Sequence, residues 1–343
     1  MKSFEWASPP TLAQALDART VTTATGMLSA DGRPPTDAVV LKAGGIELMG
    51  LMKDGLLTPA RIVNLRTVPE LAGIVERADG TMRIGTNITL AELARDRVVI
   101  ARYRALADAV GNSASPQLRE VATIGGNLLQ RPHCWYFRSA HYHCARKGGA
   151  MCFAFAGENQ YHAIFGQDGC AIVHPSTSAT ALVALGAKLE LSRAGHTPRV
   201  VALESFFVPP ATDVRRENDL RDGEILTAIL LPAMGPRMRS AHLRQGELDS
   251  FDWPIADVAV ALDLEPSGEC RSAAVVLGSA APVPYRARGA EAVLTGGRIS
   301  DDSARRAAKA ALAGAAPLAK NAYKLPVFEA LVRRAIINAA SPT

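Results

Sequence analysis

The sequence predicts an α+β protein built from two domains, and three observations lead to that prediction. The chain has 343 residues, more than a single domain usually contains. Hydrophobic residues make up 48% and charged residues 21%, as in ordinary globular proteins, so a sizeable core can form. Strand and helix signals mingle in the first two thirds, whereas strands precede two long helices in the last third.

The first third alternates short apolar runs with glycine-rich breaks. Residues 39–42 predict a strand, Gly44-Gly45 a tight turn and residues 47–53 a short helix. Thr89 and Glu92 form a capping box that opens a helix ending at Arg95. Further elements are expected as strands at 61–65 and 82–85, a helix at 101–110, a strand-like run at 121–124 and a turn at 125–127.

The second half of the chain contains a polar connection at residues 217–223, where we place the domain boundary. A helix at 178–187 and a strand at 189–191 come before it. After it we expect strands at 225–231, 256–264 and 271–278 and helices at 301–313 and 325–339. The prediction is therefore a first domain of residues 1–222 and a C-terminal α+β domain of residues 223–343.

Charge and hydropathy exclude some classes of function. The formal net charge is +5, but Lys and Arg are scattered rather than gathered into runs, so no nucleic-acid partner is expected. The N-terminal residues lack the features of a secretory signal, and no apolar run has the length of a membrane span. We expect no membrane insertion and a cytoplasmic location, or a periplasmic one if a partner subunit carries the folded chain across the membrane.

Residues 131–170, here called the cysteine-rich insert, differ in composition from the rest of the chain. They hold four of the five cysteines, four of the seven histidines and eight of the eighteen aromatic residues. The cysteines are spaced Cys134-x9-Cys144-x7-Cys152-x17-Cys170. The fifth, Cys270, lies in a strand-like run and is expected to be a buried free thiol.

The residue types of the insert leave three kinds of site open. Four thiolates complete the coordination of a [4Fe-4S] cluster, and four ligands are also what tetrahedral zinc requires. The third alternative is a set of reduced cysteines in an aromatic-rich core. The negative charge of a cluster could be offset by the nearby cations Arg138, Arg146 and Lys147. A zinc site could be joined by the nearby histidines, which are His133, His141, His143, His162 and His174.

Two glycine pairs are candidates for binding a phosphate-containing cofactor. Gly44-Gly45 precedes a helix and can present backbone N–H groups to a pyrophosphate. Gly125-Gly126 permits a close backbone approach. The alternative for both pairs is an ordinary tight turn.

A series of collinear motifs resembles a known family. The motifs are Lys42-Ala-Gly-Gly-Ile-Glu-Leu48, Ala122-Thr-Ile-Gly-Gly-Asn-Leu-Leu-Gln-Arg131, Cys134-Trp-Tyr-Phe-Arg138, Gly157-Glu-Asn-Gln-Tyr-His-Ala-Ile-Phe-Gly166, His174-Pro-Ser176 and Ser250-Phe-Asp-Trp253. They resemble the FAD-binding medium subunits of the xanthine dehydrogenase, or molybdenum hydroxylase, family. The resemblance covers nearly the whole chain and is strongest to the branch with an inserted [4Fe-4S] cluster, as in periplasmic aldehyde oxidoreductase.

This resemblance implies a fold, a function and a set of site residues. Residues 1–222 would form a flavin-binding fold of two subdomains, and substrate would be oxidised in a molybdenum-cofactor large subunit. Electrons would pass through a [2Fe-2S] small subunit to FAD and the [4Fe-4S] cluster of this chain, which has no catalytic residue of its own. The implied cluster ligands are Cys134, Cys144, Cys152 and Cys170, and the implied FAD-binding residues are Lys42, Ala43, Gly44, Gly45, Ile46, Glu47, Leu48, Ala122, Thr123, Ile124, Gly125, Gly126, Asn127, Thr177 and Arg244.

The chain departs from the family pattern at four positions. Ile46 stands where Thr is usual, Glu120 replaces Asn, Thr177 replaces Asp, and Arg244 aligns loosely with a Lys. Loss of these polar groups would weaken FAD binding, because a charge-assisted hydrogen bond contributes about 1.5–3 kcal/mol. The alternative function is therefore a flavin-free subunit of the same kind of complex, bearing the cluster as a structural or relay element.

Overall fold

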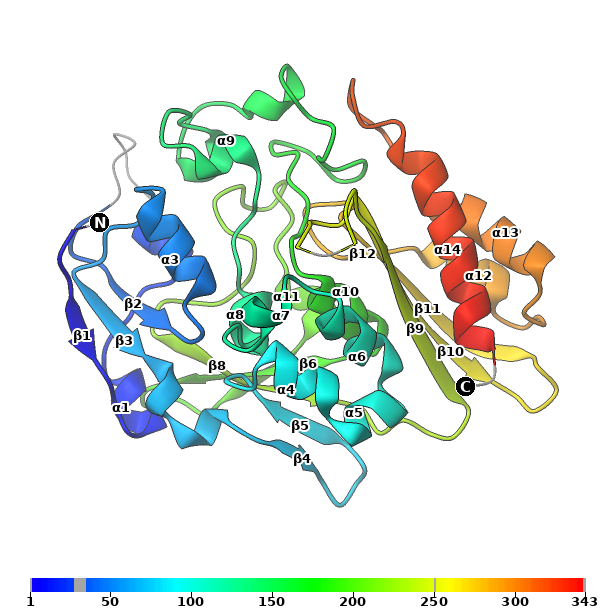
Figure 1. Ribbon diagram of the computed structural model, residues 1–343, viewed down its shortest axis with the longest axis horizontal. Helices are drawn as coiled ribbons and strands as arrows, with labels where there is room; N and C mark the ends of the chain where they lie inside the picture. Colours follow the sequence, from blue (N-terminus) through cyan, green and yellow to red (C-terminus); the bar gives the residue numbers. More distant parts are fainter. Residues whose placement is uncertain (1, 28–34, 250, 342–343) are drawn as a thin grey trace.

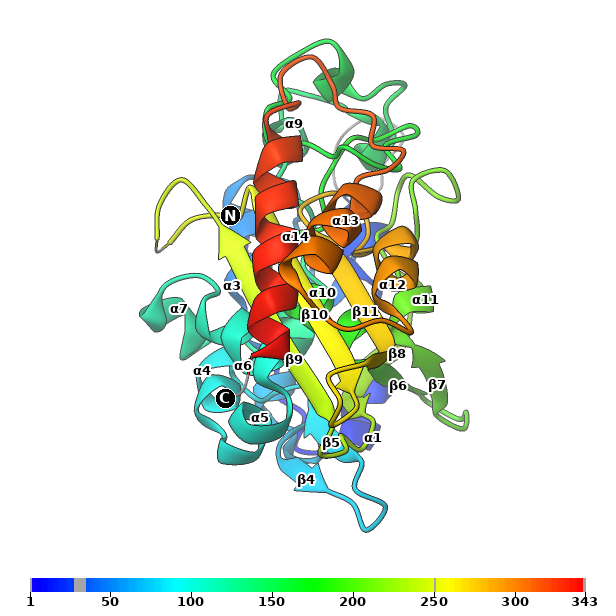
Figure 2. The same ribbon diagram turned by 90° about the vertical axis from the view of Figure 1, so that its right-hand side faces the viewer.

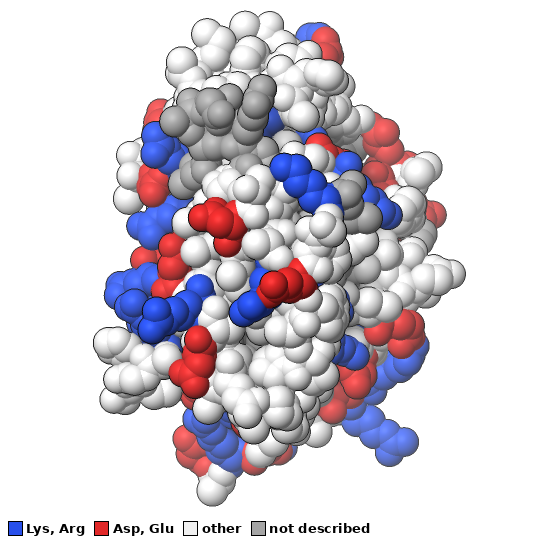
Figure 3. Space-filling model, turned by 90° about the vertical axis from the view of Figure 1, so that its left-hand side faces the viewer, with Lys and Arg blue, Asp and Glu red and all other residues white. Residues whose placement is uncertain are grey.

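The computed structural model describes residues 2–27, 35–249 and 251–341, so Ser250 of the sixth motif lies outside the described residues. Three β-sheets organise the described part of the chain, with helices packed between and around them (Figure 1). Among the described residues, no helix has the length and apolar character needed to cross a membrane. On the face shown in Figure 3, basic side chains are interspersed with acidic ones, as the scattered Lys and Arg of the sequence predict.

The first sheet has the strand order β1-β3-β2, and both pairings are parallel. Buried Val40 and Ile62 on the strands pack with Leu51 of a helix against the inner face. Phe137 and Cys144 of the insert belong to the same apolar cluster, so the insert is anchored on this subdomain. The elements are β1 (Glu5–Ala7), α1 (Leu12–Leu16), α2 (Thr23–Met27), β2 (Val39–Lys42), α3 (Ile46–Lys53), β3 (Arg61–Asn64), η1 (Leu65–Thr67) and η2 (Pro69–Leu71).

The second sheet is antiparallel, with the order β4-β5-β8-β6-β7. The predicted capping box is confirmed, because the Thr89 hydroxyl accepts from the Glu92 N–H and the Glu92 carboxylate accepts from the Thr89 N–H. The elements are β4 (Ile74–Glu76), β5 (Met82–Gly85), α4 (Leu90–Arg95), α5 (Arg97–Arg102), α6 (Arg104–Gly111), α7 (Pro116–Arg119), α8 (Ile124–Leu128), α10 (Thr177–Ala184), β6 (Lys188–Arg193), β7 (Arg199–Ala202), α11 (Leu203–Phe206) and β8 (Glu224–Leu231).

The third sheet, β12-β11-β10-β9, is covered by helices on both faces. Figure 2 shows α12, α13 and α14 over one face. Successive strand residues point to opposite faces: Val258 and Val260 pack toward these helices, whereas Ala259 and Ala261 belong to the core shared with α6 and α10. The elements are β9 (Met238–Gln245), β10 (Ala256–Leu264), β11 (Cys270–Gly278), β12 (Tyr285–Arg286), α12 (Arg288–Leu294), α13 (Asp301–Ala311) and α14 (Lys324–Ala340).

The insert projects from the body of the molecule as a set of loops with short helical turns (Figure 1). The turns are α9 (Trp135–Arg138), η3 (Ala145–Lys147) and η4 (Phe153–Phe155). Little of its backbone belongs to regular secondary structure, and hydrogen bonds of turns, such as that from the Lys147 N–H to the Cys144 carbonyl oxygen, hold its loops together with side-chain contacts.

Three sequence predictions need correction. The strand-like run at 121–124 and the turn at 125–127 contain helix α8, because the Thr123 hydroxyl caps it by accepting from the Gly126 N–H at 3.2 Å. The helix expected at 101–110 is divided at Tyr103, which is fully buried.

The strand expected at 225–231 forms as β8, but it pairs with β5 and β6 of the second sheet. It is therefore part of the second sheet and not of the C-terminal sheet. We propose that the domain boundary lies between β8 and β9, at residues 232–237, instead of after residue 222.

Candidate cofactor sites

A large cavity of about 910 Å³ opens between the first two sheets. Its walls include residues 42–48 of the β2–α3 connection and Ala122, Thr123, Gly125, Gly126 and Asn127 from the start of α8. The two glycine pairs, separated by 80 residues in the sequence, thus line one cavity, as the sequence analysis expected. Volumes of this order are typical of sites that enclose a small molecule or cofactor.

Glycine is required sterically where the two loops meet. A Cβ on Gly44 would lie 2.4 Å from the carbonyl oxygen of Val121, and one on Gly125 would lie 2.7 Å from Cβ of Thr86. Gly45 has φ +92°, a left-handed conformation that other residues adopt with strain. Gly44 therefore lets the two loops pack backbone against backbone, and Gly125 lets α8 begin close to Thr86.

Helix α3 presents its N-terminus to the cavity. Gly45 is the N-cap residue and has no side-chain group to accept hydrogen bonds from the first turn. The first N–H groups of a helix have no partner within it, and the helix dipole makes that end favourable for an anion. The end of α3 therefore has the character of a phosphate-binding site. The start of α8 is less open, because the N–H groups of Ile124 and Gly125 donate to Ile88 and Thr86 carbonyl oxygens.

The residues that depart from the family pattern lie in different surroundings. Ile46 lines the cavity and is 42% exposed. The Glu120 carboxylate accepts from Arg95 on the surface, so its charge is paired and does not face the cavity lining. Thr177 and Arg244 both line the cavity. However, the Thr177 hydroxyl is hydrogen-bonded to Ser113 at 2.7 Å.

Several implied FAD-binding side chains are engaged by the protein itself. Arg244 donates to the Asn112 and Asp252 carbonyl oxygens at 2.7 and 3.1 Å, and Asn127 Oδ1 accepts from Ser176 at 2.6 Å. Ile124 is fully buried in the core and does not line the cavity. The cavity surface is more apolar than polar, although charged residues such as Lys42, Arg215 and Asp222 also line it.

Glu47 connects the large cavity to the insert. Its carboxylate accepts from Arg138 Nη2 at 2.8 and 2.9 Å and from the Arg131 N–H at 3.1 Å. Burial raises the pKa of Glu47, and Arg138 offsets part of this effect. The side chain therefore holds the insert against α3, a role that the sequence analysis did not anticipate.

The second cavity is small and is formed by the insert. Its lining includes Cys134, Cys144, Cys152 and Cys170, which places all four insert cysteines around one space. Cys270 lies elsewhere, fully buried in the C-terminal core with its thiol 3.3 Å from the Ser272 carbonyl oxygen. The expectation that Cys270 is a buried free thiol is confirmed.

The cysteines and histidines of the insert are the possible ligands of a single metal ion. In the described ranges 2–27, 35–249 and 251–341, no three His, Cys, Asp or Glu side chains are placed to hold one metal ion. Tetrahedral zinc requires sulfur ligands about 2.3 Å from a common centre. His162 lines the cysteine cavity, and its Nε2 atom lies 3.3 Å from Cys134 Sγ. The other histidines of the insert lie elsewhere: His141 and His143 are exposed, and His133 stacks on Trp253.

The protein environment makes the four thiols unequal. Burial raises the pKa of Cys134 to about 11. The pKa of Cys170 is lowered, because its sulfur accepts from the Cys152 thiol and lies beside the Arg146 guanidinium. Burial lowers the pKa of His162 to about 4, so this ring is neutral at pH 7.

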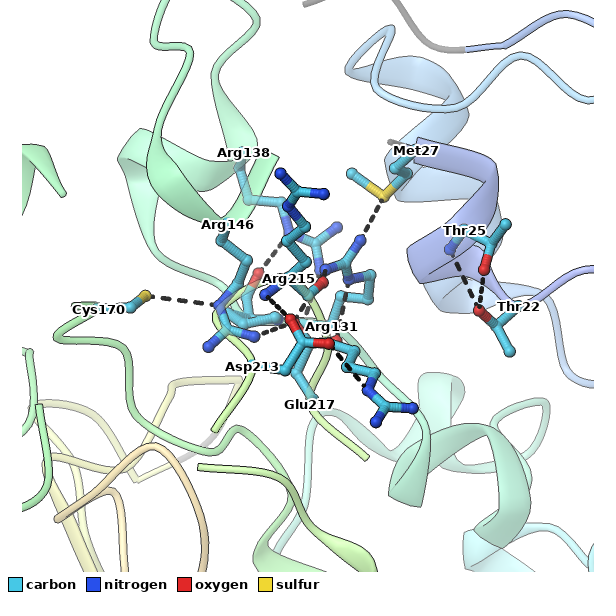
Figure 4. Close-up of polar contacts among 12 residues, drawn as sticks. Thr22, Thr25, Met27, Arg131, Arg138, Arg146, Cys170, Asp213, Arg215 and Glu217 are labelled. Carbon is cyan, nitrogen blue, oxygen red and sulfur yellow. Dashed lines mark hydrogen bonds and ion pairs between the residues drawn. The ribbon is translucent and has the colours of Figure 1, made fainter. Parts of the chain in front are cut away.

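A buried charge network lies between the two cavities (Figure 4). Glu217 accepts from Arg131 Nε and Nη2 at 3.1 and 3.0 Å and from Arg146 Nη1 at 2.7 Å. Arg146 Nε is also 3.5 Å from Cys170 Sγ. Arg131, Arg146 and Glu217 are each less than 5% exposed. Sequence reasoning missed Glu217, which lies in an unremarkable polar connection, although Arg131 ended one of the quoted motifs.

The structure thus has two subdomains of helices and sheet around a cavity large enough for a cofactor, followed by a C-terminal α+β domain. Residues 2–234 match the family described as "FAD binding domain in molybdopterin dehydrogenase". Residues 241–339 match the family described as "CO dehydrogenase flavoprotein C-terminal domain". The chain belongs to the FAD-binding subunit family of the molybdenum hydroxylases. It is therefore an oxidoreductase subunit.

Individual relatives agree with this assignment. The FAD-binding subunit of an aldehyde oxidoreductase from Escherichia coli K12 is 33% identical over 285 residues, covering 82% of this chain and 86% of that protein. The carbon monoxide dehydrogenase medium chain of Hydrogenophaga pseudoflava is 28% identical and covers 90% and 91%. A solved structure of carbon monoxide dehydrogenase from the latter organism superimposes with a TM-score of 0.73 at 24% identity, covering 98% and 97%.

Proposed function

We propose that this chain is the electron-transfer subunit of a molybdenum-cofactor dehydrogenase and carries one FAD and one [4Fe-4S] cluster. The observation that supports the cluster most strongly is the placement of four cysteines around one small, buried cavity. A [4Fe-4S] cluster takes one thiolate per iron, so its ligands surround a volume and do not converge on a point.

Basic groups in the wall of this cavity and beside it suit an anionic cluster. Arg146 is buried beside Cys170, and the Lys147 ammonium donates to the Tyr136 carbonyl oxygen at 3.3 Å close to Cys144. Buried cations and N–H donors compensate the negative charge of thiolate ligands. Arg138, by contrast, is paired with Glu47 and serves the contact with α3.

FAD fits the larger cavity through backbone groups. The open first turn of α3 would hold the pyrophosphate, and the contact of Gly44 with the backbone of residues 121–123 would fix the two loops around the cofactor. The substitutions Ile46 and Thr177 leave these N–H groups in place. When bound, FAD and the cluster would supply the electron-transfer chemistry, and this chain's residues would bind and orient them.

Partners and substrate class follow from the relatives. We propose that a molybdenum-cofactor large subunit and a [2Fe-2S] small subunit assemble with this chain. An aldehyde or related compound would be oxidised in the large subunit, since the relative at 33% identity is a subunit of an aldehyde oxidoreductase. Electrons would then leave through this chain to an acceptor.

The test is metal and flavin analysis of the complex purified through a tag on this chain. We expect two co-purifying polypeptides, a flavin absorption band and iron in excess of that held by the small subunit. Cys134→Ser, Cys144→Ser, Cys152→Ser and Cys170→Ser should each lose the excess iron, whereas the matched control Cys270→Ser should retain it. Iron lost in Cys270→Ser but kept in Cys152→Ser would refute the ligand assignment.

The same sample separates the two candidate functions. An intact cluster without any flavin band would favour the flavin-free relay subunit. Full dehydrogenase activity in the isolated chain would contradict the subunit function altogether.

A further inference from the structure

Arg146 is an unusual side chain because part of its guanidinium is buried without a partner. The side chain is 1% exposed and lines the cysteine cavity. Nη1 donates to Glu217 and Nε lies 3.5 Å from Cys170 Sγ, but Nη2 has no hydrogen-bond partner among the described residues. A buried charged donor that lacks an acceptor is costly. The free N–H groups therefore indicate an acceptor that belongs in this cavity.

Glu217 holds this guanidinium in place but does not neutralise its surroundings. The one carboxylate is shared by Arg131 and Arg146, so the three side chains together carry a formal charge of +1, from two positive charges and one negative. Arg131 also donates to the Arg215 carbonyl oxygen at 2.8 Å and is fixed from both sides. The network is thus a rigid, buried, positively charged support at one wall of the cysteine cavity.

We propose that Arg146 sets the reduction potential of the iron–sulfur cluster by donating N–H···S hydrogen bonds to the Cys170 thiolate and to a second sulfur, and that Glu217 positions it. This inference rests on the proposed function, because it requires the cluster. Adding an electron makes the cluster more negative, so N–H donors and positive charge stabilise the reduced form more than the oxidised form. Arg146 should accordingly raise the potential and favour electron entry from the partner subunit.

A purely structural role for the network makes a different prediction. If Arg146 served only to hold the insert in shape, its replacement would change stability or iron content and leave the potential of the remaining clusters unaltered. Potential and spectrum, measured per intact cluster, distinguish the two roles.

The experiment uses the purified complex and compares wild type with Arg146→Gln, Arg146→Lys and Glu217→Asp. Arg286→Gln is the control, because Arg286 is also an ion-paired arginine, with Glu204 and Glu291 as its partners, but lies in the C-terminal domain. Each sample is titrated with dithionite in the presence of redox mediators and followed by electron paramagnetic resonance. The [2Fe-2S] centres of the partner subunit serve as an internal reference.

We expect Arg146→Gln to lower the equilibrium constant for cluster reduction about tenfold, equivalent to about 59 mV for a one-electron couple. Arg146→Lys keeps the charge but cannot reach Glu217 and Cys170 with one planar fork, so its potential should fall by less. Glu217→Asp keeps every charge but shortens the side chain by one methylene. A lower reduction potential in this variant would show that Glu217 positions the Arg146 guanidinium. Resonance Raman spectra should show altered Fe–S(Cys) stretching in Arg146→Gln and wild-type stretching in Arg286→Gln.

Each other outcome overturns the inference. Wild-type potential and spectrum in both Arg146 variants would show a structural role only. If Arg146→Gln loses its iron, Arg146→Lys and Glu217→Asp replace it in the test. An unshifted reduction potential in both of these variants would also show a structural role only. Wild-type complex without the excess iron would refute the proposed cluster itself, and iron analysis identifies that failure before any titration.

Discussion

The two candidate cofactor sites differ in the chemical groups that form them. The large cavity is lined by two glycine-rich loops, the open end of α3 and a surface that is more apolar than polar, and polar residues such as Arg244 at its wall are bonded to the protein itself. The cysteine cavity is formed by side chains carried on loops and is supported by a buried ion network. One site therefore depends mainly on chain geometry, and the other on residue identity.

This difference explains which substitutions each site tolerates. Exchange of a side chain leaves backbone N–H groups in place, so the chain can carry Ile46 and Thr177 and keep the open first turn of α3. A buried charge or thiolate has no such substitute, because loss of one member leaves its partner desolvated and uncompensated. The predictions that follow test whether damage to the two sites follows this rule.

Removal of Glu217 should give the largest effect on stability. Glu217→Ala leaves Arg131 and Arg146 buried without their carboxylate, and breaking such a pair costs about 3–5 kcal/mol. The measurement is the denaturant midpoint of the purified chain. The matched control is Glu76→Ala, which removes a carboxylate from an exposed pair with Arg102 and should cost about 1 kcal/mol or less. An equal decrease in the free energy of unfolding in the two variants would show that the buried network contributes no more to stability than an exposed ion pair.

A pH effect of slightly smaller size is expected from His174, which is fully buried near Glu217. Burial lowers its pKa from 6.5 to about 4, so between these values the unfolded chain binds a proton that the folded chain does not. The free energy of unfolding should therefore decrease as pH falls from 6.5 to 4, by up to about 3 kcal/mol.

Replacement of His174 isolates this contribution. Asn can still accept from the Ser176 N–H, as His174 Nδ1 does at 3.3 Å, but does not titrate in this range. Denaturation at several pH values should show a shallower acid slope for His174→Asn than for wild type. His196→Asn, at an exposed turn, should keep the wild-type slope. A wild-type slope in His174→Asn would assign the acid sensitivity to other groups.

The sequence predictions succeeded where the signal is local and failed where it depends on a single contact or on distant residues. Strands such as 39–42, 82–85 and 256–264 were predicted with their observed bounds, because alternation and glycine breaks are local signals. Helix α8 was missed, since its cap depends on one hydroxyl, on Thr123, in a run of β-branched residues. The pairing of β8 with β5 was beyond local reasoning, as it joins residues 143 to 149 positions apart.

The candidate sites show the same limit. Spacing alone left the cysteines open to zinc, a cluster or no metal, and it is the tertiary fold that gathers four of them at one cavity. Glu217 had no local signal, because nothing in its neighbourhood indicates that two arginines from the insert converge on it. The role of Glu47 was likewise hidden, since its partners lie more than 80 residues away.

A test of the backbone-built site is Gly44→Ala. The new Cβ would lie 2.4 Å from the Val121 carbonyl oxygen, so the two loops must separate. Overpacking of this kind costs about 1–3 kcal/mol. We expect reduced FAD retention after dialysis with the iron content unchanged. Gly235→Ala is the control, because a Cβ there meets no atom within 4 Å. Iron loss in Gly44→Ala would show that the two sites are not independent.

The smallest expected effect, and the sharpest test of the comparison, is Ile46→Thr. Residue 46 is the first residue of α3 and lines the large cavity, so a hydroxyl there can reach the phosphate-binding end of the helix. Because Ile46 is 42% exposed, the new bond must replace one to water, and the net gain should be about 0.5–1.5 kcal/mol. FAD dissociation constants measured by fluorescence should therefore decrease a few-fold.

Ile46→Val is the matched control, since it keeps the branched shape without the hydroxyl. A gain in the Val variant equal to that in the Thr variant would point to shape instead of hydrogen bonding. Tight FAD binding in the wild type with no gain in either variant would mean that the backbone groups of α3 alone determine the affinity.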